Sequence, residues 1–284
     1  MQLYEKYGRP FNYRTAQDAA YSTIEYGHHY NKLCIPSIDE HAFYDVFLII
    51  CSSSTEFDRR AKIRIRMTKL LEQFNVGYLF VLGSNVEVDH RIRRENREFQ
   101  DILQLGHVDC YHHITLSVFG ALQFLAAYTG ITNYFLKTDS DCIYNLQRII
   151  QTVQHTKRPY IGNCRFSDYY ITTKRYLKMF VPESLVQKDL RIPPYATGAG
   201  YLIRSAILPQ LMIAIRHLNF IGHNEDVNIG KAFNLLNRNC TFESDWVARK
   251  GCFSVGECRK YAILHKNVSE EEVDRMWYYI TKRF

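Results

Sequence analysis

The sequence predicts an α/β fold in which helices flank a mostly parallel central sheet. Short apolar runs alternate along the chain with segments that carry apolar residues at helical spacing, which is typical of repeated β-α units. The apolar runs are continuous rather than alternating, so they indicate strands that are buried on both faces. The length of 284 residues, with 46% hydrophobic and 23% charged residues, suits a single large domain with a sizeable core.

Residues 1–43 are polar, rich in Tyr and His, and without a clear period, so we predict an N-terminal extension there and one folded domain over residues 44–284. The predicted strands of this domain cover 45–50, 77–82, 133–137 and 160–164. Five helices are predicted. The first carries apolar residues at helical spacing, the second is mostly charged around 92–99, and the third is apolar over 114–128. A fourth follows an acidic turn, and a fifth opens at Asn224. The apolar residues of the first are Ile63, Met67, Leu70, Leu71 and Phe74, and those expected to point inward in the fourth are Leu146, Ile149, Ile150 and Val153.

The chain has a net charge of +7, and its basic residues cluster locally in two runs, residues 59–66 and 91–94. Because neither run is interleaved with aromatic residues and the sequence has no nucleic-acid-binding motif, we interpret both as solvated faces of amphipathic helices and expect no nucleic-acid partner. The eight cysteines include no CxxC pair, which argues against a structural zinc site and leaves disulfide pairing open. No apolar run approaches the ~20 residues that span a bilayer, so we expect a soluble chain.

Two carboxylates stand where the third predicted strand ends, in Asp139-Ser140-Asp141. At positions i and i+2 near a strand end they can point the same way, and without a cation between them they repel each other. Their oxygen atoms suit Mg²⁺ or Mn²⁺ holding a diphosphate. A plain acidic turn is the alternative, but the position at the carboxyl end of a buried strand favours ligand binding.

Two further segments can face the same ligand. Asn224-Glu225-Asp226 opens a helix with Asn224 as N-cap, so its acids are either ordinary first-turn residues or include a general base that faces a cleft. A helix N-terminus lowers the pKa of a carboxyl group and burial raises it, and the sequence leaves the outcome open. Between Tyr195 and Tyr201, two glycines either form a tight turn or let the backbone approach a ligand closely.

Taken in order, these segments resemble the β1,3-galactosyltransferase family, glycosyltransferase family 31, over roughly residues 45–280. The resemblance rests on seven motifs in register: Arg60-Ala61-Lys62-Ile63-Arg64, Phe80-Val81-Leu82-Gly83, Glu95…Phe99-Gln100-Asp101-Ile102-Leu103 with Asp109-Cys110-Tyr111…Thr115-Leu116, Lys137-Thr138-Asp139-Ser140-Asp141, Pro194-Tyr195…Gly198-Ala199-Gly200-Tyr201…Ser205, Glu225-Asp226-Val227…Gly230, and His265-Lys266 ahead of Met276-Trp277.

The resemblance implies a single GT-A type nucleotide-diphospho-sugar transferase domain. It implies inverting transfer of a hexose from a UDP-sugar to an acceptor hydroxyl in β1,3 linkage, with Mn²⁺ or Mg²⁺ as cofactor. The implied roles are catalysis by Asp226, metal binding by Asp141 and His265, donor binding by Arg60, Arg64, Asp101, Lys137, Asp139 and Ser140, and a sugar and acceptor pocket of Tyr195, Gly198, Gly200 and Glu225. The donor sugar stays open between galactose and an N-acetylhexosamine, and the acceptor is a glycan, glycoprotein or glycolipid.

The resemblance also implies a place in the Golgi lumen, in protein or lipid glycosylation, with a membrane association made through a signal anchor that this chain does not contain. Sequons at Asn239 and Asn267 are compatible with a secretory compartment. The chain departs from the family pattern at three places: Arg66-Met67 replaces a Thr-Trp pair, Ser140 replaces an acid, and Ser117 replaces a lysine. These departures leave a second interpretation open, a catalytically inactive member that binds a sugar or nucleotide.

Overall fold

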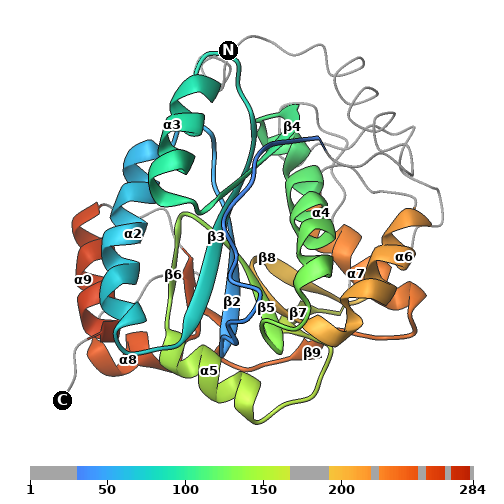
Figure 1. Cartoon of the computed structure of the whole chain (residues 1–284). Helices are drawn as coiled ribbons and strands as arrows, with labels where there is room; N and C mark the ends of the chain where they lie inside the picture. Colours follow the sequence, from blue (N-terminus) through green and yellow to red (C-terminus); the bar gives the residue numbers. More distant parts are fainter. Residues whose placement is uncertain (1–30, 167–191, 219–223, 249–253, 266–269, 282–284) are drawn as a thin grey trace, which may run out of the picture.

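The computed structural model describes residues 31–166, 192–218, 224–248, 254–265 and 270–281, and it is built on an eight-stranded sheet (Figure 1). The strand order is β1-β4-β3-β2-β5-β8-β7-β9. The strands are β1 (Lys32–Cys34), β2 (Val46–Cys51), β3 (Val76–Ser84), β4 (Ile102–Val108), β5 (Tyr134–Asp139), β7 (Tyr160–Arg165), β8 (Tyr195–Arg204) and β9 (Thr241–Phe242). Neighbours among β4, β3, β2 and β5 are parallel, and β8 runs antiparallel to both β5 and β7. The predicted mostly parallel sheet is confirmed.

Helices cover both faces of this sheet (Figure 1). One hydrophobic core joins α2 (Phe57–Leu71), α3 (Asp89–Phe99) and α5 (Leu146–Gln154), and the other joins α4 (Ile114–Leu125), α6 (Leu208–Arg216) and α7 (Glu225–Leu235). Strand β2 contributes Val46, Leu48 and Ile50 to the first core and Phe47 and Ile49 to the second. Because successive side chains of a strand point to opposite faces, a continuous apolar run is what a two-sided core requires.

A smaller, three-stranded sheet joins residues 247–248 and 263–265 to the segment that follows β5. It consists of β10 (Val247–Ala248), β11 (Ile263–His265) and β6 (Cys142–Tyr144), in that order, and α8 (Val255–Lys260) and α9 (Glu270–Thr281) accompany it. Strand β6 corrects the sequence prediction, which placed a helix directly after the acidic turn. Residues 142–144 are extended because they pair with β11, a partner more than a hundred residues away that no local pattern reveals. Three short 3₁₀ segments complete the described elements: η1 (Tyr111–His113), η2 (Ala126–Tyr128) and η4 (Ser205–Ile207).

The helix after β2 departs from its prediction in two ways. Leu71 is exposed and Phe74 lies beyond the last helical residue, so the inward stripe ends at Leu70. The interpretation of the basic run 59–66 as a solvated face is wrong for Arg60 and Arg64, which are buried. Their charges are accepted in the interior because acidic partners meet them there, as described below.

Strand β1 falls inside the segment predicted as an extension, and it pairs antiparallel with β4. Residues 1–30 lie outside the described part of the chain, so the division at residue 43 stays a prediction. Cys164 and Cys240 form a disulfide, which joins the end of β7 to the residue before β9. In the described residues, no helix is long and apolar enough to cross a membrane.

The strand order fixes where a ligand can bind. From β2 the chain adds β3 and then β4 on one side, and it crosses afterwards to place β5 on the other side of β2. In open sheets of this kind, a crevice opens outside the carboxyl ends of the two strands at which the order reverses. That point lies between β2, which runs into Ser52–Ser54, and β5, which runs into Asp139–Asp141.

Candidate active site

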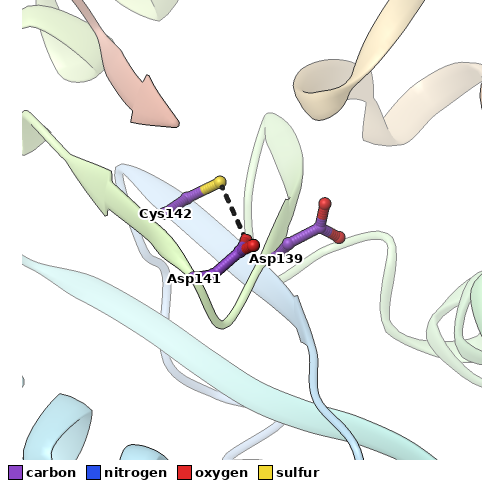
Figure 2. A group of neighbouring side chains, drawn as sticks. All are labelled: Asp139, Asp141 and Cys142. Carbon is purple, nitrogen blue, oxygen red and sulfur yellow. Dashed lines mark hydrogen bonds between the residues drawn. The ribbon is translucent and has the colours of Figure 1, made fainter. Parts of the chain in front are cut away.

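The acid turn, defined as Asp139-Ser140-Asp141, follows directly from the end of β5. Asp139 is the last residue of the strand, and the amide of Ser140 donates to the carbonyl of Cys51 in β2 at 2.8 Å. Asp141 is exposed, and its Oδ1 lies 3.7 Å from the thiol of Cys142 (Figure 2). Ligand atoms of Asp139, Asp141 and Cys142 all lie within 4.8 Å of one another. The two carboxylates are therefore close enough to share a cation.

The donor set of this turn suits a hard divalent cation. Carboxylate oxygens are the ligands that Mg²⁺ and Mn²⁺ prefer. Burial raises the pKa of Cys142 well above its usual value, and its thiol contacts the carbonyl of Ala199 at 3.3 Å, so it stands beside the site as a neutral group. The backbone of His265 in β11 pairs with Cys142, which brings that strand next to the acid turn.

Lys137 connects the acid turn with the helix that carries the predicted base. Its side chain is 1% exposed, and Nζ lies 2.8 Å from Asp139 Oδ1, 2.6 Å from the carbonyl of Gly198 and 3.3 Å from Glu225 Oε2. Burial by itself would lower the pKa of Lys137, but the carboxylates of Asp139 and Glu225 raise it well above its usual value. A single ammonium ion thus joins β5, β8 and α7.

Two acids open α7 and differ in their surroundings. Glu225 is buried, and its Oε1 accepts a hydrogen bond from the hydroxyl of Tyr201. Asp226 is half-buried; its Oδ2 accepts from the amide of Gly198 at 3.2 Å and its Oδ1 from the amide of Val227 at 2.9 Å. Burial raises the pKa of Glu225 to about 7 and also raises the pKa of Asp226. The question that the sequence left open is resolved: burial outweighs the helix N-terminus.

The segment with two glycines is part of strand β8 and forms no tight turn. Gly198 faces the start of α7, where an added Cβ would lie 3.3 Å from Glu225 Oε2 and 3.7 Å from Asp226 Oδ2. Tyr195 is buried and packs against Gly230 of α7. Gly200 instead faces the small sheet, since its added Cβ would lie 2.1 Å from Ile263 Cδ1. Gly198 therefore lies near both acids of α7. At Gly200, the space that a side chain would take is occupied by Ile263.

Arg60, Arg64 and Asp101 form a buried ionic network together with Glu95. Arg60 Nε and Nη2 contact the two oxygens of Glu95 at 2.9 and 2.7 Å. Arg64 Nε and Nη2 contact Asp101 at 2.7 and 2.8 Å, and its Nη1 contacts Glu95 at 2.7 Å. Burial alone would raise the pKa of Glu95, but Arg60 and Arg64 lower it. The contacts of this network connect α2, α3 and the start of β4, and the donor-binding role of its members stays a prediction.

A hollow of about 660 Å³ lies at the other end of the sheet from the acid turn. Its lining includes Glu72, Tyr78, Gln100 and Asp101, near the amino-terminal ends of β3 and β4. The acid turn follows the carboxyl end of β5, so this hollow is not the place where the acid turn and Asp226 approach each other.

Two residues of the site had no role in the sequence prediction. Glu56 precedes α2 and contacts Ser140, and the Ser-rich run before it is the signal that could have indicated a structured loop. Tyr111 stands in η1 and is 40% exposed. Its partial burial, followed by the charges of Asp226 and Asp139, raises its pKa to about 12. Its motif was noticed in the sequence, but the proximity of these acids arises from chain folding.

Acidic groups gather at the switch point of this α/β sheet, and the similarity to known proteins identifies the class to which the chain belongs. The model of the galactosyltransferase family matches residues 58–239. The chain is 27% identical over 241 residues to beta-1,3-galactosyltransferase 1 of Mus musculus and of Homo sapiens, covering 81% of this chain and 73% of each relative. It is 26% identical over 199 residues to beta-1,3-galactosyltransferase 2 of Mus musculus, covering 65% of this chain and 46% of that protein.

Among solved structures, the chain shows a distant likeness to the galactosyltransferase LgtC in complex with donor and acceptor sugar analogues. The likeness covers 82% of this chain and 95% of that one, with a TM-score of 0.44 and 9% identity. A glycosyltransferase involved in the glycosylation of the major capsid of PBCV-1 has a TM-score of 0.44 and 12% identity, over 81% of this chain and 98% of that one. From the match of the family model, the chain belongs to the galactosyltransferase family. It is a glycosyltransferase.

Proposed function

We propose that this enzyme transfers a hexose, galactose or an N-acetylhexosamine, from a UDP-sugar to a hydroxyl of a glycan acceptor, with inversion, in β1,3 linkage and with a divalent metal ion. The observation that supports this most is the connection across Lys137 and Gly198. Lys137 contacts Asp139 and the carbonyl of Gly198, while the amide of Gly198 contacts Asp226. Lys137 and Gly198 therefore form a short bridge between two groups. On one side is the acid turn, which suits a metal ion and a diphosphate, and on the other is Asp226, which suits a general base.

The metal site in this proposal consists of Asp141 and His265, with Asp139 beside them. These residues would hold Mn²⁺ or Mg²⁺, which would stabilise the negative charge that builds on the leaving diphosphate oxygen. Lys137 places a second positive charge behind Asp139 and holds that carboxylate in position through a contact of 2.8 Å. Ser140 belongs to the donor side of the same turn. Arg60, Arg64 and Asp101 support the donor side through the network that packs α2 against α3.

Asp226 is the proposed general base. Its raised pKa favours proton uptake from an acceptor hydroxyl, while the amides of Gly198 and Val227 hold both oxygens in place. Glu225 is buried and paired with Lys137 and Tyr201, so it supports the start of α7 from behind. Tyr195 and Gly198 contribute the β8 wall of the sugar and acceptor pocket in this proposal, whereas Gly200, which faces Ile263 of the small sheet, is left out of that wall.

The cellular setting is part of the proposal. The Cys164–Cys240 disulfide favours an oxidising compartment, because the cytosol keeps protein thiols reduced. A Golgi-lumen enzyme of protein or lipid glycosylation fits this chemistry and the family. Its partners are then the UDP-sugar donor and a glycan, glycoprotein or glycolipid acceptor.

The test is a screen of UDP-sugars with Mn²⁺ against an acceptor panel, scored by released UDP, with Asp226→Asn as the diagnostic variant. We expect the variant to bind UDP with Mn²⁺ as the wild type does and to lose transfer by roughly 10²–10⁴-fold, the contribution of a positioned base. Glu98→Gln, an exposed acid in α3, is the matched control and should keep full activity. Full transfer by Asp226→Asn would exclude the assigned base. UDP binding without any transfer by the wild type would favour the inactive relative.

A further inference from the structure

Glu56 is a carboxylate that the proposed reaction does not use, yet it contacts the acid turn directly. We propose that Glu56 is a positioning residue that holds the acid turn in its metal-binding shape through the hydroxyl of Ser140. The inference rests on the proposed function, since it assigns a residue to the metal and donor side of that site. It adds a contact between two segments that lie 84 residues apart in the sequence.

One oxygen of Glu56 gathers three donors. Oε2 accepts from the hydroxyl of Ser140 at 2.8 Å, from the amide of Ser53 at 3.0 Å and from the hydroxyl of Ser52 at 3.2 Å. The other oxygen pairs with Arg59. Hydrogen bonds to an ionised carboxylate are stronger than neutral ones, so this group can fix two loops against each other. The loops are those that follow β2 and β5, on the two sides of the switch point.

The carboxylate of Glu56 stands on a loop that is itself held firmly. Asp109 accepts from the hydroxyl of Ser53 at 2.8 Å and from the amide of Ser54 at 2.7 Å. Arg60 Nη1 donates to the carbonyl of Ser53 at 2.6 Å, which ties the loop to the buried network of α2 and α3. Residues 52–54 thus receive contacts from α2 and from the segment after β4. A group fixed in this way can act as an anchor for the acid turn.

The acid turn needs an anchor on the side of Ser140. Asp139 and Asp141 repel each other, and Lys137 holds Asp139 from the other side. Ser140 lies between the two acids, its amide bonded to Cys51 and its hydroxyl to Glu56. A turn held in advance lets a cation bind without ordering the backbone, which strengthens binding. Since the oxygens of Glu56 already accept from Ser140, Ser52, Ser53 and Arg59, Glu56 acts by position and is not assigned as a metal ligand.

The experiment is a double-mutant cycle of Ser140→Ala and Glu56→Ala in the full chain. Affinity for UDP in the presence of Mn²⁺ is measured by calorimetry, and KM and kcat are measured with the active UDP-sugar. We expect each single variant to weaken Mn²⁺-dependent UDP binding by roughly tenfold. This factor corresponds to the loss of one hydrogen bond to a charged group, taken at the lower end of the energies that such bonds contribute. KM should rise more than kcat falls. The double variant should be no worse than either single variant, because both remove the same contact.

A second readout needs no ligand. Amide hydrogen exchange of the peptide that contains residues 139–141 should be faster in Ser140→Ala and Glu56→Ala than in the wild type. Glu56→Gln keeps an oxygen that can accept from Ser140 and should rescue much of the protection, which also covers the case in which Glu56→Ala does not fold. Ser244→Ala, an exposed serine between β9 and β10, is the matched control and should behave as the wild type.

The outcomes separate the inference from the proposed function. Additive effects, or wild-type affinity and exchange in Ser140→Ala, would overturn the role of Glu56 while the transferase proposal stands. If the wild type binds no UDP with Mn²⁺, the proposed function fails, and the exchange measurement alone decides whether Glu56 holds the turn.

Discussion

At the scale of single residues, Lys137 shows how a buried charge can organise a site. Its ammonium group meets Asp139, Glu225 and the carbonyl of Gly198 in a position that is 1% exposed. A buried ammonium ion without partners is strongly unfavourable, and so is a buried carboxylate such as that of Glu225 without a cation. The three groups therefore depend on one another. Each predicted half of the site, the acid turn and the start of α7, is held by the same atom.

Replacing this cation should destabilise the fold. We expect Lys137→Met to lower the free energy of unfolding by about 3–5 kcal/mol, because it removes the cation that both Asp139 and the buried Glu225 contact. Urea denaturation followed by circular dichroism measures this. Lys157→Met, at an exposed position, is the control and should change stability by less than about 0.5 kcal/mol. A loss in Lys137→Met as small as that of the control would contradict the assigned role.

At the scale of elements, β8 links the main sheet to the small one at Gly200. Its carbonyl accepts from the indole of Trp246 at 2.9 Å, and its missing side chain leaves room for Ile263 of β11. The sequence motif suggested a ligand as the reason for this glycine. The contact shows that a neighbouring strand already requires it, because an added Cβ would meet Ile263 Cδ1 at 2.1 Å.

Gly200→Ala should therefore act as an overpacking substitution. We expect it to lower the free energy of unfolding by about 1–3 kcal/mol, and Ile263→Val in the same protein to restore part of the loss, because it deletes the clashing methyl group. Thermal unfolding of the two single variants and the double variant measures the coupling. If Gly200→Ala were as stable as the wild type but bound UDP-sugar poorly, the glycine would serve the pocket rather than the packing.

At the scale of the whole molecule, the chain carries a net charge of +7 but gathers acids at the carboxyl edge of its sheet. Asp139, Asp141, Glu225 and Asp226 come from β5, the turn after it and α7. Lys137 compensates part of this charge, and a bound divalent ion would compensate more. Stability and ligand binding are therefore linked through the protonation of the same groups.

The linkage gives a pH dependence with a definite sign. The pKa of Glu225 is raised to about 7, so the native state holds a proton there that the unfolded chain releases near pH 4.5. The stabilisation is complete below pH 4.5 and is lost as pH rises through 7, a contribution of roughly 3 kcal/mol. Asp226, whose pKa is also raised, acts in the same direction. Denaturation between pH 5 and 8 should show a steeper decline in the wild type than in Glu225→Gln. Parallel curves would refute the assignment to Glu225.

Much of this fold could be predicted because its information is local. The run of β2 is apolar at every position since both faces of that strand are covered, and the apolar helix over 114–128 appears as α4 followed by η2. The acid turn was expected at a strand end and lies there. Strand β6 and the burial of Arg60 were not predicted, because both depend on partners distant in sequence, β11 and Glu95.

By itself, the sequence determined the class of fold, the family and the residues that carry charge at the site, since side-chain type and period along the chain are enough for these. Only the tertiary structure decided which charges meet. Lys137 pairs with Glu225 and Glu56 with Ser140 because strands and helices far apart in the chain end at one edge of a sheet. Such proximity depends on the order in which the chain places its strands in the sheet. The packing that results decides how deeply each acid is buried, and burial raises the pKa of a carboxyl group.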